Sequence, residues 1–141
     1  MMSSDKPRHS SGLFGRFTAR RGAGRERGQQ AEALAQHHLE ARGLRLVQRN
    51  YQCRRGEIDL VMEEGATLVF VEVRYRRTGA YGRPEETVGP RKQARLVAAA
   101  QHYLQHTRQH ARPCRFDVVA LTGRKGDNCA LQWITHAFDA D

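Results

Sequence analysis

The stretch "RRGEIDLVMEEGATLVFVEVRYRR" (residues 54–77) predicts two strands and a turn, with an acidic residue inside each strand. Residues 56–64 and 67–76 are mainly apolar, and a turn predicted at Glu64-Gly65 leads from the first run into the second. This pattern is typical of a β-hairpin. Asp59 lies in the first run and Glu72 in the second. Because ionised carboxylates are seldom buried without a partner, these two must face either solvent or a positive charge.

Side chains alternate between the two faces of a strand, and this alternation places the two acids. Asp59 shares a face with Val61, and Glu72 shares a face with Arg74. The other face of the first strand receives Ile58, Leu60 and Met62. In a hairpin the two carboxylates would be neighbours across the strand pair, and one would be protonated unless a cation lay between them. We therefore expect Asp59 and Glu72 to bind Mg²⁺ or Mn²⁺, which prefer oxygen ligands.

The flanking segments extend the predicted order of elements to α-β-β-β-α-β-β. Residues 1–25 are rich in Ser, Gly and Arg and predict a disordered basic tail, followed by one domain at 26–141. Short, closely spaced strands suggest an antiparallel meander. The remaining elements are a helix at 26–43, a strand at 44–53, a helix at 91–110 and strands at 114–123 and 130–138.

Charge and cysteine content narrow the class of protein. Lys and Arg number 24 against 15 Asp and Glu, a net charge of +9, which favours a polyanionic partner and nucleic acid first. No apolar run approaches the roughly 18 residues that a membrane span needs. The 3 cysteines are widely spaced, which indicates reduced thiols in a cytoplasmic protein. A homodimer is compatible with the sequence.

Two further acids lie near the predicted site. Glu32 is about 20° from Leu39 around the first helix, at the edge of its apolar face, where it could lean over the sheet as a third carboxylate. Asp117 shares a strand face with Val119. We expect Asp117 to orient a neighbouring group or to cap the sheet, and we assign it no metal.

Several segments together resemble a known group of enzymes. "GEIDL" (56–60) followed by "VFVEVR" (69–74) resembles the PD-(D/E)XK nuclease superfamily. With "GQQAEALA" (28–35) and "CRFDVV" (114–119), the chain resembles the YraN family of predicted endonuclease-like proteins over residues 26–138. The resemblance implies an α/β fold with a restriction-endonuclease-like core, a mixed sheet flanked by helices rather than a plain meander. It also implies that Asp59 and Glu72 bind metal, with Glu32 assisting.

One position departs from the superfamily pattern, which has a catalytic lysine where this chain has Arg74. Arginine can stabilise negative charge on a phosphate, but it stays protonated and cannot act as a base. Lys92, near the start of the second helix, could replace that lysine. The predicted catalytic set is therefore Asp59, Glu72, Arg74, Glu32 and Lys92.

The segment after the second acidic strand predicts a nucleic-acid-binding surface of basic and aromatic residues: Arg76, Arg77, Tyr81, Arg83 and Arg91. Three functions remain open. The first is a metal-dependent DNA endonuclease, selective for branched or damaged DNA as a Holliday-junction resolvase is. The second is a nucleic-acid-binding module, for DNA or RNA, that keeps the nuclease fold without turnover. An RNA- or ribosome-associated factor fits the charge equally well.

Overall fold

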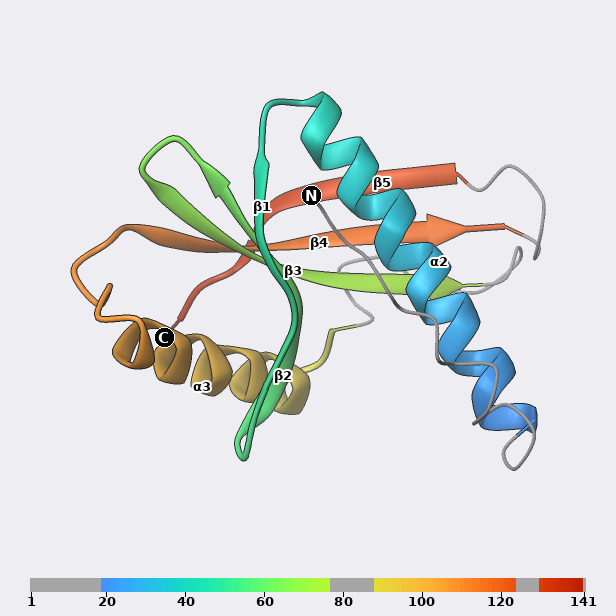
Figure 1. Ribbon diagram of the computed structural model, residues 1–141, viewed down its shortest axis with the longest axis horizontal. Coiled ribbons are helices and arrows are strands. Elements are labelled where there is room, and N and C mark those ends of the chain that lie inside the picture. The colour runs from blue at the N-terminus through green and yellow to red at the C-terminus, as the bar shows by residue number, and fades with distance from the viewer. Residues whose placement is uncertain (1–18, 77–87, 124–129, 141) are drawn as a thin grey trace. The chain divides into compact units, whose positions relative to one another are not determined.

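A computed structural model describes residues 19–76, 88–123 and 130–140 of the chain, with side chains from residue 28 onward. The chain divides into two compact units, Met1–Gln30 and Ala31–Asp141, and the second unit holds every strand of the described part. The elements, drawn in Figure 1, are α2 (Ala19–Ala41), β1 (Arg45–Cys53), β2 (Gly56–Glu64), β3 (Thr67–Arg76), α3 (Pro90–His106), β4 (Cys114–Thr122) and β5 (Ala130–Phe138).

The strands form one mixed sheet in the order β1-β2-β3-β4-β5. The first three strands are antiparallel neighbours, as the predicted meander requires. The meander is wrong beyond them, because β4 pairs with β3 in parallel while β5 is antiparallel to β4. A parallel neighbour needs a crossover connection, and α3 lies within the connection between β3 and β4. The expectation of a mixed sheet flanked by helices is confirmed.

The two helices cover opposite faces of the sheet. On one face α3 contributes Leu96, Ala99, Ala100 and Tyr103 to a core with Phe70 and Val118. On the other face α2 contributes Ala31, Ala35 and Leu39 to a core with Val69, Val71 and Val119. Because both faces are covered, the central strands are buried along most of their length and read as continuous apolar runs.

Each of the two helices has boundaries that differ from those predicted from the sequence. Helix α2 begins at Ala19 rather than near residue 26, so the predicted border between tail and domain falls inside a helix. Ala and Arg are good helix formers and outweigh the cost of the intervening glycines. Residues 1–18 of the predicted tail lie outside the described residues. Helix α3 ends at His106 rather than 110, and Arg108 beyond it takes the left-handed φ of 57°.

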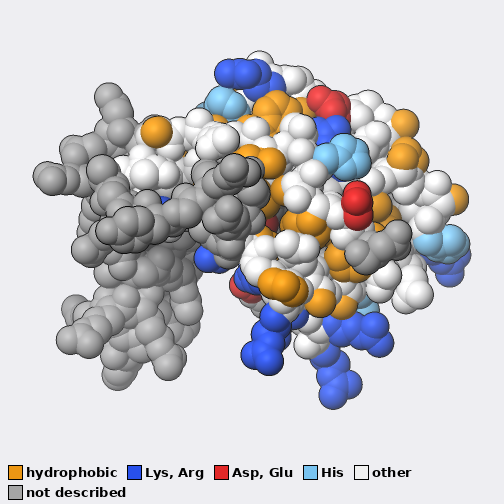
Figure 2. All heavy atoms as spheres, turned by 180° about the vertical axis from the view of Figure 1, so that it is seen from behind, with side chains coloured by type: hydrophobic (Ala, Val, Ile, Leu, Met, Phe, Trp, Pro, Cys, Tyr) orange, Lys and Arg blue, Asp and Glu red, His pale blue; other side chains and the backbone are white. Residues whose placement is uncertain are grey.

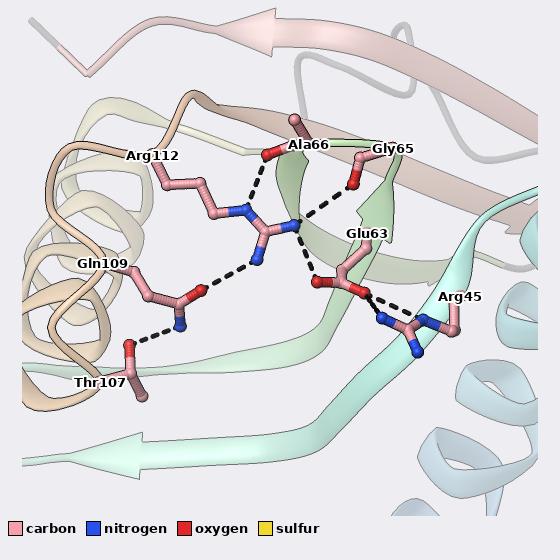
Figure 3. A network of polar contacts seen from close by, with 7 residues as sticks. All are labelled: Arg45, Glu63, Gly65, Ala66, Thr107, Gln109 and Arg112. Carbon is pink, nitrogen blue, oxygen red and sulfur yellow. Dashed lines mark hydrogen bonds and ion pairs between the residues drawn. The ribbon is translucent and has the colours of Figure 1, made fainter.

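The turn between β2 and β3 is held by an arginine from the segment that leads from α3 into β4, which lies at the same end of the sheet (Figure 3). Arg112 forms an ion pair of 2.8 Å with Glu63 and donates a hydrogen bond of 2.7 Å to the Ala66 carbonyl. A further bond of 2.9 Å joins Arg112 to Gln109, and Arg45 pairs with Glu63 from the side of β1. These contacts help to hold in place the hairpin that carries Asp59 and Glu72.

Asp117 is a fully buried acid with a structural role. It accepts hydrogen bonds from Arg115 Nε at 3.1 Å, from Trp133 Nε1 at 2.9 Å and from the His136 backbone N–H at 3.1 Å. These donors lie on β4 and β5, where the pairing of the two strands is interrupted by a bulge. Asp117 therefore holds the bulge together by orienting neighbouring groups, which is one of the two roles expected of it.

Within the described ranges, no helix is long and apolar enough to cross a membrane.

Candidate active site

Strand β2 changes the alternation of its side chains at Asp59. Ile58 packs into the core beneath α3, whereas Leu60 and Met62 pack into the core beneath α2. The prediction that Ile58 shares a face with Leu60 and Met62 is therefore wrong. The neighbouring strand is irregular at the same level, because Asn50 of β1 has a left-handed φ of 53°. This local distortion leaves Asp59 accessible to charges from both faces of the sheet.

Asp59 and Glu72 come together as the hairpin pattern predicts. Leu60 pairs with Val71, and the two acids are one residue further along their antiparallel strands. Asp59 Oδ2 accepts a hydrogen bond of 2.8 Å from the Val73 backbone N–H, and the two carboxyl groups hydrogen-bond to each other. The Glu72 side chain is only 4% exposed. A pair of carboxyl groups, with Glu72 buried and Asp59 half-buried, thus lies on two neighbouring strands inside the sheet.

Two cations approach the same oxygen of this pair. Lys92 Nζ lies 3.6 Å from Glu72 Oε2, and Arg74 Nη1 lies 3.5 Å from that atom. Lys92 comes from the first turns of α3, whereas Arg74 comes from β3, two residues beyond the acid. Both cationic side chains are 37% exposed. The arrangement therefore has an acidic interior and a basic, solvent-accessible rim.

Burial raises the pKa values of both acids, and the charge of Asp59 raises the pKa of Glu72 further. The pKa of Glu72 rises to about 8, first because the side chain is buried and second because the charge of Asp59 is close. Lys92 and Arg74 oppose this rise only in part. Burial also raises the pKa of Asp59, and the Val73 N–H works in the opposite direction. At neutral pH the pair therefore retains a proton in the absence of a metal ion.

Glu32 adds a third acid beside Asp59. Its pKa rises to about 7, chiefly through burial and then through the charge of Asp59, and a hydrogen bond to Asn50 lowers it. Arg49 Nη2 lies 3.7 Å from Glu32 Oε1, which is buried and has no hydrogen-bond partner in the described part of the chain. An unsatisfied buried oxygen beside two further acids marks a place where an additional donor or a cation would be stabilising.

The residues present suit a cation held by two carboxylates. Within the described residues, no group of three or more His, Cys, Asp and Glu side chains is arranged to hold a metal ion. Glu32 is an electrostatic neighbour of Asp59, and its assistance in binding a metal stays a prediction. Mg²⁺ usually takes only one or two carboxylates and completes its shell with water and substrate phosphate. Asp59 and Glu72 fit that requirement.

The predicted nucleic-acid-binding residues are only partly covered by the structure. Arg91 is exposed on α3 directly before Lys92, and Arg76 ends β3 in a half-exposed position. Arg77, Tyr81 and Arg83 lie outside the described residues.

Sequence reasoning missed Asn50 and Arg49, which both contact Glu32. The available signal was an asparagine in the middle of a strand, where this residue is disfavoured, next to an arginine. Asparagine tolerates the left-handed backbone conformation better than most residues do. Asn50 lies beside Asp59 across the pair of strands β1 and β2, so the distortion of β1 occurs next to the acidic residues.

The raised pKa of Glu72 predicts a pH-dependent stability. Between pH 4.5 and about 8 the folded protein keeps a proton on Glu72 that the unfolded chain releases. The free energy of unfolding should therefore fall as pH rises through this window and level off above it. Glu72→Gln lacks this loss and should be more stable than the wild type at pH 9, by on the order of 3 kcal/mol, with little difference at pH 4.5.

Urea denaturation at pH 5, 7 and 9 in the presence of EDTA would measure this difference. Glu40→Gln removes an exposed glutamate of α2 that is hydrogen-bonded by Gln36, and it should follow the wild-type pH profile. A Glu72→Gln curve parallel to the wild type would mean that Glu72 titrates normally.

Comparison with known proteins gives one consistent family. Residues 31–121 match the profile described as "Uncharacterised protein family UPF0102". A UPF0102 protein of Nitrosococcus oceani is 60% identical over 116 residues, covering 81% of this chain and 92% of the relative. A UPF0102 protein of Pseudomonas syringae pv. syringae is 53% identical over 114 residues, covering 80% and 93%. One from Pseudomonas aeruginosa is 48% identical over 122 residues, covering 85% and 98%.

Proposed function

The chain belongs to the UPF0102 family, and we propose that it is a metal-dependent DNA endonuclease. The observation that carries this proposal is the pair of Asp59 and Glu72 with two cations on one of its oxygens. Burial of acidic groups close to each other costs folding free energy. Carboxyl groups with pKa values perturbed in this way are frequent at catalytic sites. The resemblance of "GEIDL" and "VFVEVR" to the PD-(D/E)XK nucleases supports the same reaction.

Asp59 and Glu72 would hold a Mg²⁺ or Mn²⁺ ion. When bound, such an ion lowers the pKa of water and neutralises charge that develops on a phosphodiester. The Val73 N–H donates to Asp59 Oδ2 and would fix the orientation of this carboxylate toward the ion. Binding of a cation would displace the proton that the acidic pair retains at neutral pH, so affinity for the ion should increase with pH.

Lys92 and Arg74 would stabilise the substrate from the basic rim. The ammonium of Lys92 and the guanidinium of Arg74 both donate hydrogen bonds and carry charge beside Glu72, where they could hold phosphate oxygens. A guanidinium donates hydrogen bonds and does not act as a general base, whereas a lysine side chain can serve in proton transfer. We therefore assign to Lys92 the role that the superfamily gives to the lysine replaced here by Arg74.

The second candidate function is a nucleic-acid-binding module without turnover. The arginine at position 74 favours it, because the expected general base is absent from β3. The position of Lys92 beside Glu72 favours the enzyme. Selectivity for branched DNA is part of the first proposal and comes from the resemblance to resolvase-like folds.

A substrate panel separates the two functions. The full-length protein would be incubated with labelled duplex, flap and four-way-junction DNA, and with matching RNA, in Mg²⁺, Mn²⁺ or EDTA. We expect cleavage of DNA only with a metal ion, fastest on the four-way junction. Binding without cleavage on every substrate would support the non-catalytic module. Preferential cleavage of RNA would replace the proposed substrate class.

A further inference from the structure

The tip of the β1–β2 hairpin presents two adjacent arginines beside α3. Arg54 and Arg55 form the turn between Cys53 and Gly56, which pair across the hairpin, and both side chains are exposed. Gly56 is buried, and a Cβ atom there would lie 2.7 Å from the Arg95 carbonyl oxygen. Only a glycine allows so close an approach. The hairpin tip is therefore pressed against the backbone of α3 at Arg95.

Helix α3 adds arginines of its own to this surface. Arg91 and Arg95 are both exposed and are four residues apart, so they occupy the same side of the helix. Lys92, next to Arg91, lies 3.6 Å from Glu72 and connects this side of α3 to the candidate active site. We call Arg54, Arg55, Arg91 and Arg95 the hairpin–helix surface.

None of these four arginines forms an ion pair within the described residues, which sets them apart from several others. Arg45, Arg112 and Arg115 each pair with a glutamate. Glu57, the acid nearest to the turn in the sequence, accepts a hydrogen bond from Gln52. Figure 2 shows Lys and Arg side chains projecting together from the lower edge of the molecule, the edge at which Figure 1 places the tip of the β1–β2 hairpin.

The same surface borders a hollow along the second half of α3. This hollow has a volume of about 550 Å³, and its wall exposes both polar and apolar atoms, the apolar ones slightly more. It is lined by Arg55, Gln101, His102, Leu104, Gln105 and His110. Arg55 thus belongs both to the hairpin turn and to the wall of the hollow. Its positive charge and the hydrogen-bond donors of the two glutamines on the same wall are complementary to an anionic polymer.

We propose that the hairpin–helix surface binds the phosphate backbone of duplex DNA and guides it to the candidate active site. Four guanidinium groups on two adjoining elements, with no ion pair among the described residues, match successive phosphates in charge and in hydrogen-bond donors. The contacts are to phosphates and are therefore independent of base sequence. The identity of the polymer rests on the proposed function, whereas the surface itself rests on the positions of the arginines.

The test compares two double variants that remove the same charge. Arg54→Gln/Arg55→Gln changes the hairpin tip, and Arg42→Gln/Arg45→Gln changes two exposed arginines at the turn between α2 and β1. Binding of the full-length protein to a fluorescent DNA duplex would be measured by anisotropy in EDTA at several salt concentrations. The hairpin variant should bind about tenfold more weakly and lose about 1.8 from the slope of log K against log[salt], at about 0.9 per phosphate contact. The control should change affinity by less than about twofold.

An additional variant and an RNA substrate distinguish the possible outcomes of this test. Arg54→Lys/Arg55→Lys should restore the salt slope, which separates lost phosphate contacts from a misfolded hairpin. Equal effects of the two double variants, or no effect of either, would overturn the proposed surface. A larger loss on an RNA duplex than on DNA would overturn the choice of polymer. Because the assay needs no cleavage, an inactive protein with the predicted binding would refute only the enzymatic proposal.

Discussion

Asp59→Asn is expected to lower the single-turnover cleavage rate at saturating Mg²⁺ by about 10³-fold, which corresponds to about 4 kcal/mol in the barrier. The substitution keeps the size and the hydrogen-bond acceptor, so the Val73 N–H retains its partner at 2.8 Å. It removes the negative charge that, together with Glu72, would attract a divalent cation. The fold should therefore survive while the affinity for the ion and the rate both fall.

The matched control for Asp59→Asn is Glu40→Gln, which removes one negative charge from an exposed position on α2. It should cleave within about twofold of the wild type, because exposed charges are screened by salt over roughly 10 Å. Binding of DNA in EDTA should not weaken in Asp59→Asn, since the loss of an acid favours a polyanion. Full cleavage by Asp59→Asn would remove this acid from the mechanism and leave the proposal without its central observation.

The pairing of Asp59 and Glu72 could be predicted because it depends on local rules. A short turn, which lies at Gly65-Ala66 rather than at the predicted Glu64-Gly65, fixes which residues face each other, and antiparallel pairing brings the two acids to the same level. The side chains that depart from the prediction do so where the backbone is irregular. Ile58 leaves its predicted face at the level where Asn50 has a φ of 53°, and no periodic pattern can report such a distortion.

Contacts between elements distant in the sequence were harder to predict. The parallel pairing of β4 with β3 requires α3 to cross over the sheet between them. The order of the strands in the sequence does not reveal such a crossover. Lys92 was selected only as a replacement for the missing lysine, yet its Nζ lies within 3.6 Å of Glu72. Arg49 was not selected at all, because its ion pair with Glu32 requires β1 and α2 to meet. Such contacts depend on how the helices and strands pack together, and no residue spacing in the sequence predicts them.

Lys92→Met is expected to reduce cleavage by about 10²- to 10³-fold, the range typical of a lost general acid–base group. The reason lies in the geometry of Glu72 Oε2, which Lys92 and Arg74 both approach, at 3.6 and 3.5 Å. Methionine preserves much of the length of the side chain but removes its charge and its proton. Lys92→Arg preserves the charge but introduces a guanidinium, which cannot serve as a general acid or base, so it separates the two contributions.

The companion variant is Arg74→Lys, which should give at most a modest gain alone because Lys92 already provides a lysine. In the Lys92→Met background the same change should raise cleavage at least about tenfold, since it returns a lysine to the position that the nuclease pattern prefers. Single-turnover rates of the two single variants and the double variant measure this coupling directly. If both lysine positions serve only to hold phosphates, Lys92→Arg will match the wild type and Arg74→Lys will weaken DNA binding through loss of the bidentate guanidinium. The alternative result is that cleavage is rescued in the double variant while Lys92→Arg cleaves slowly. This result would require a proton on lysine in the rate-determining step, because arginine at position 92 supplies the same positive charge.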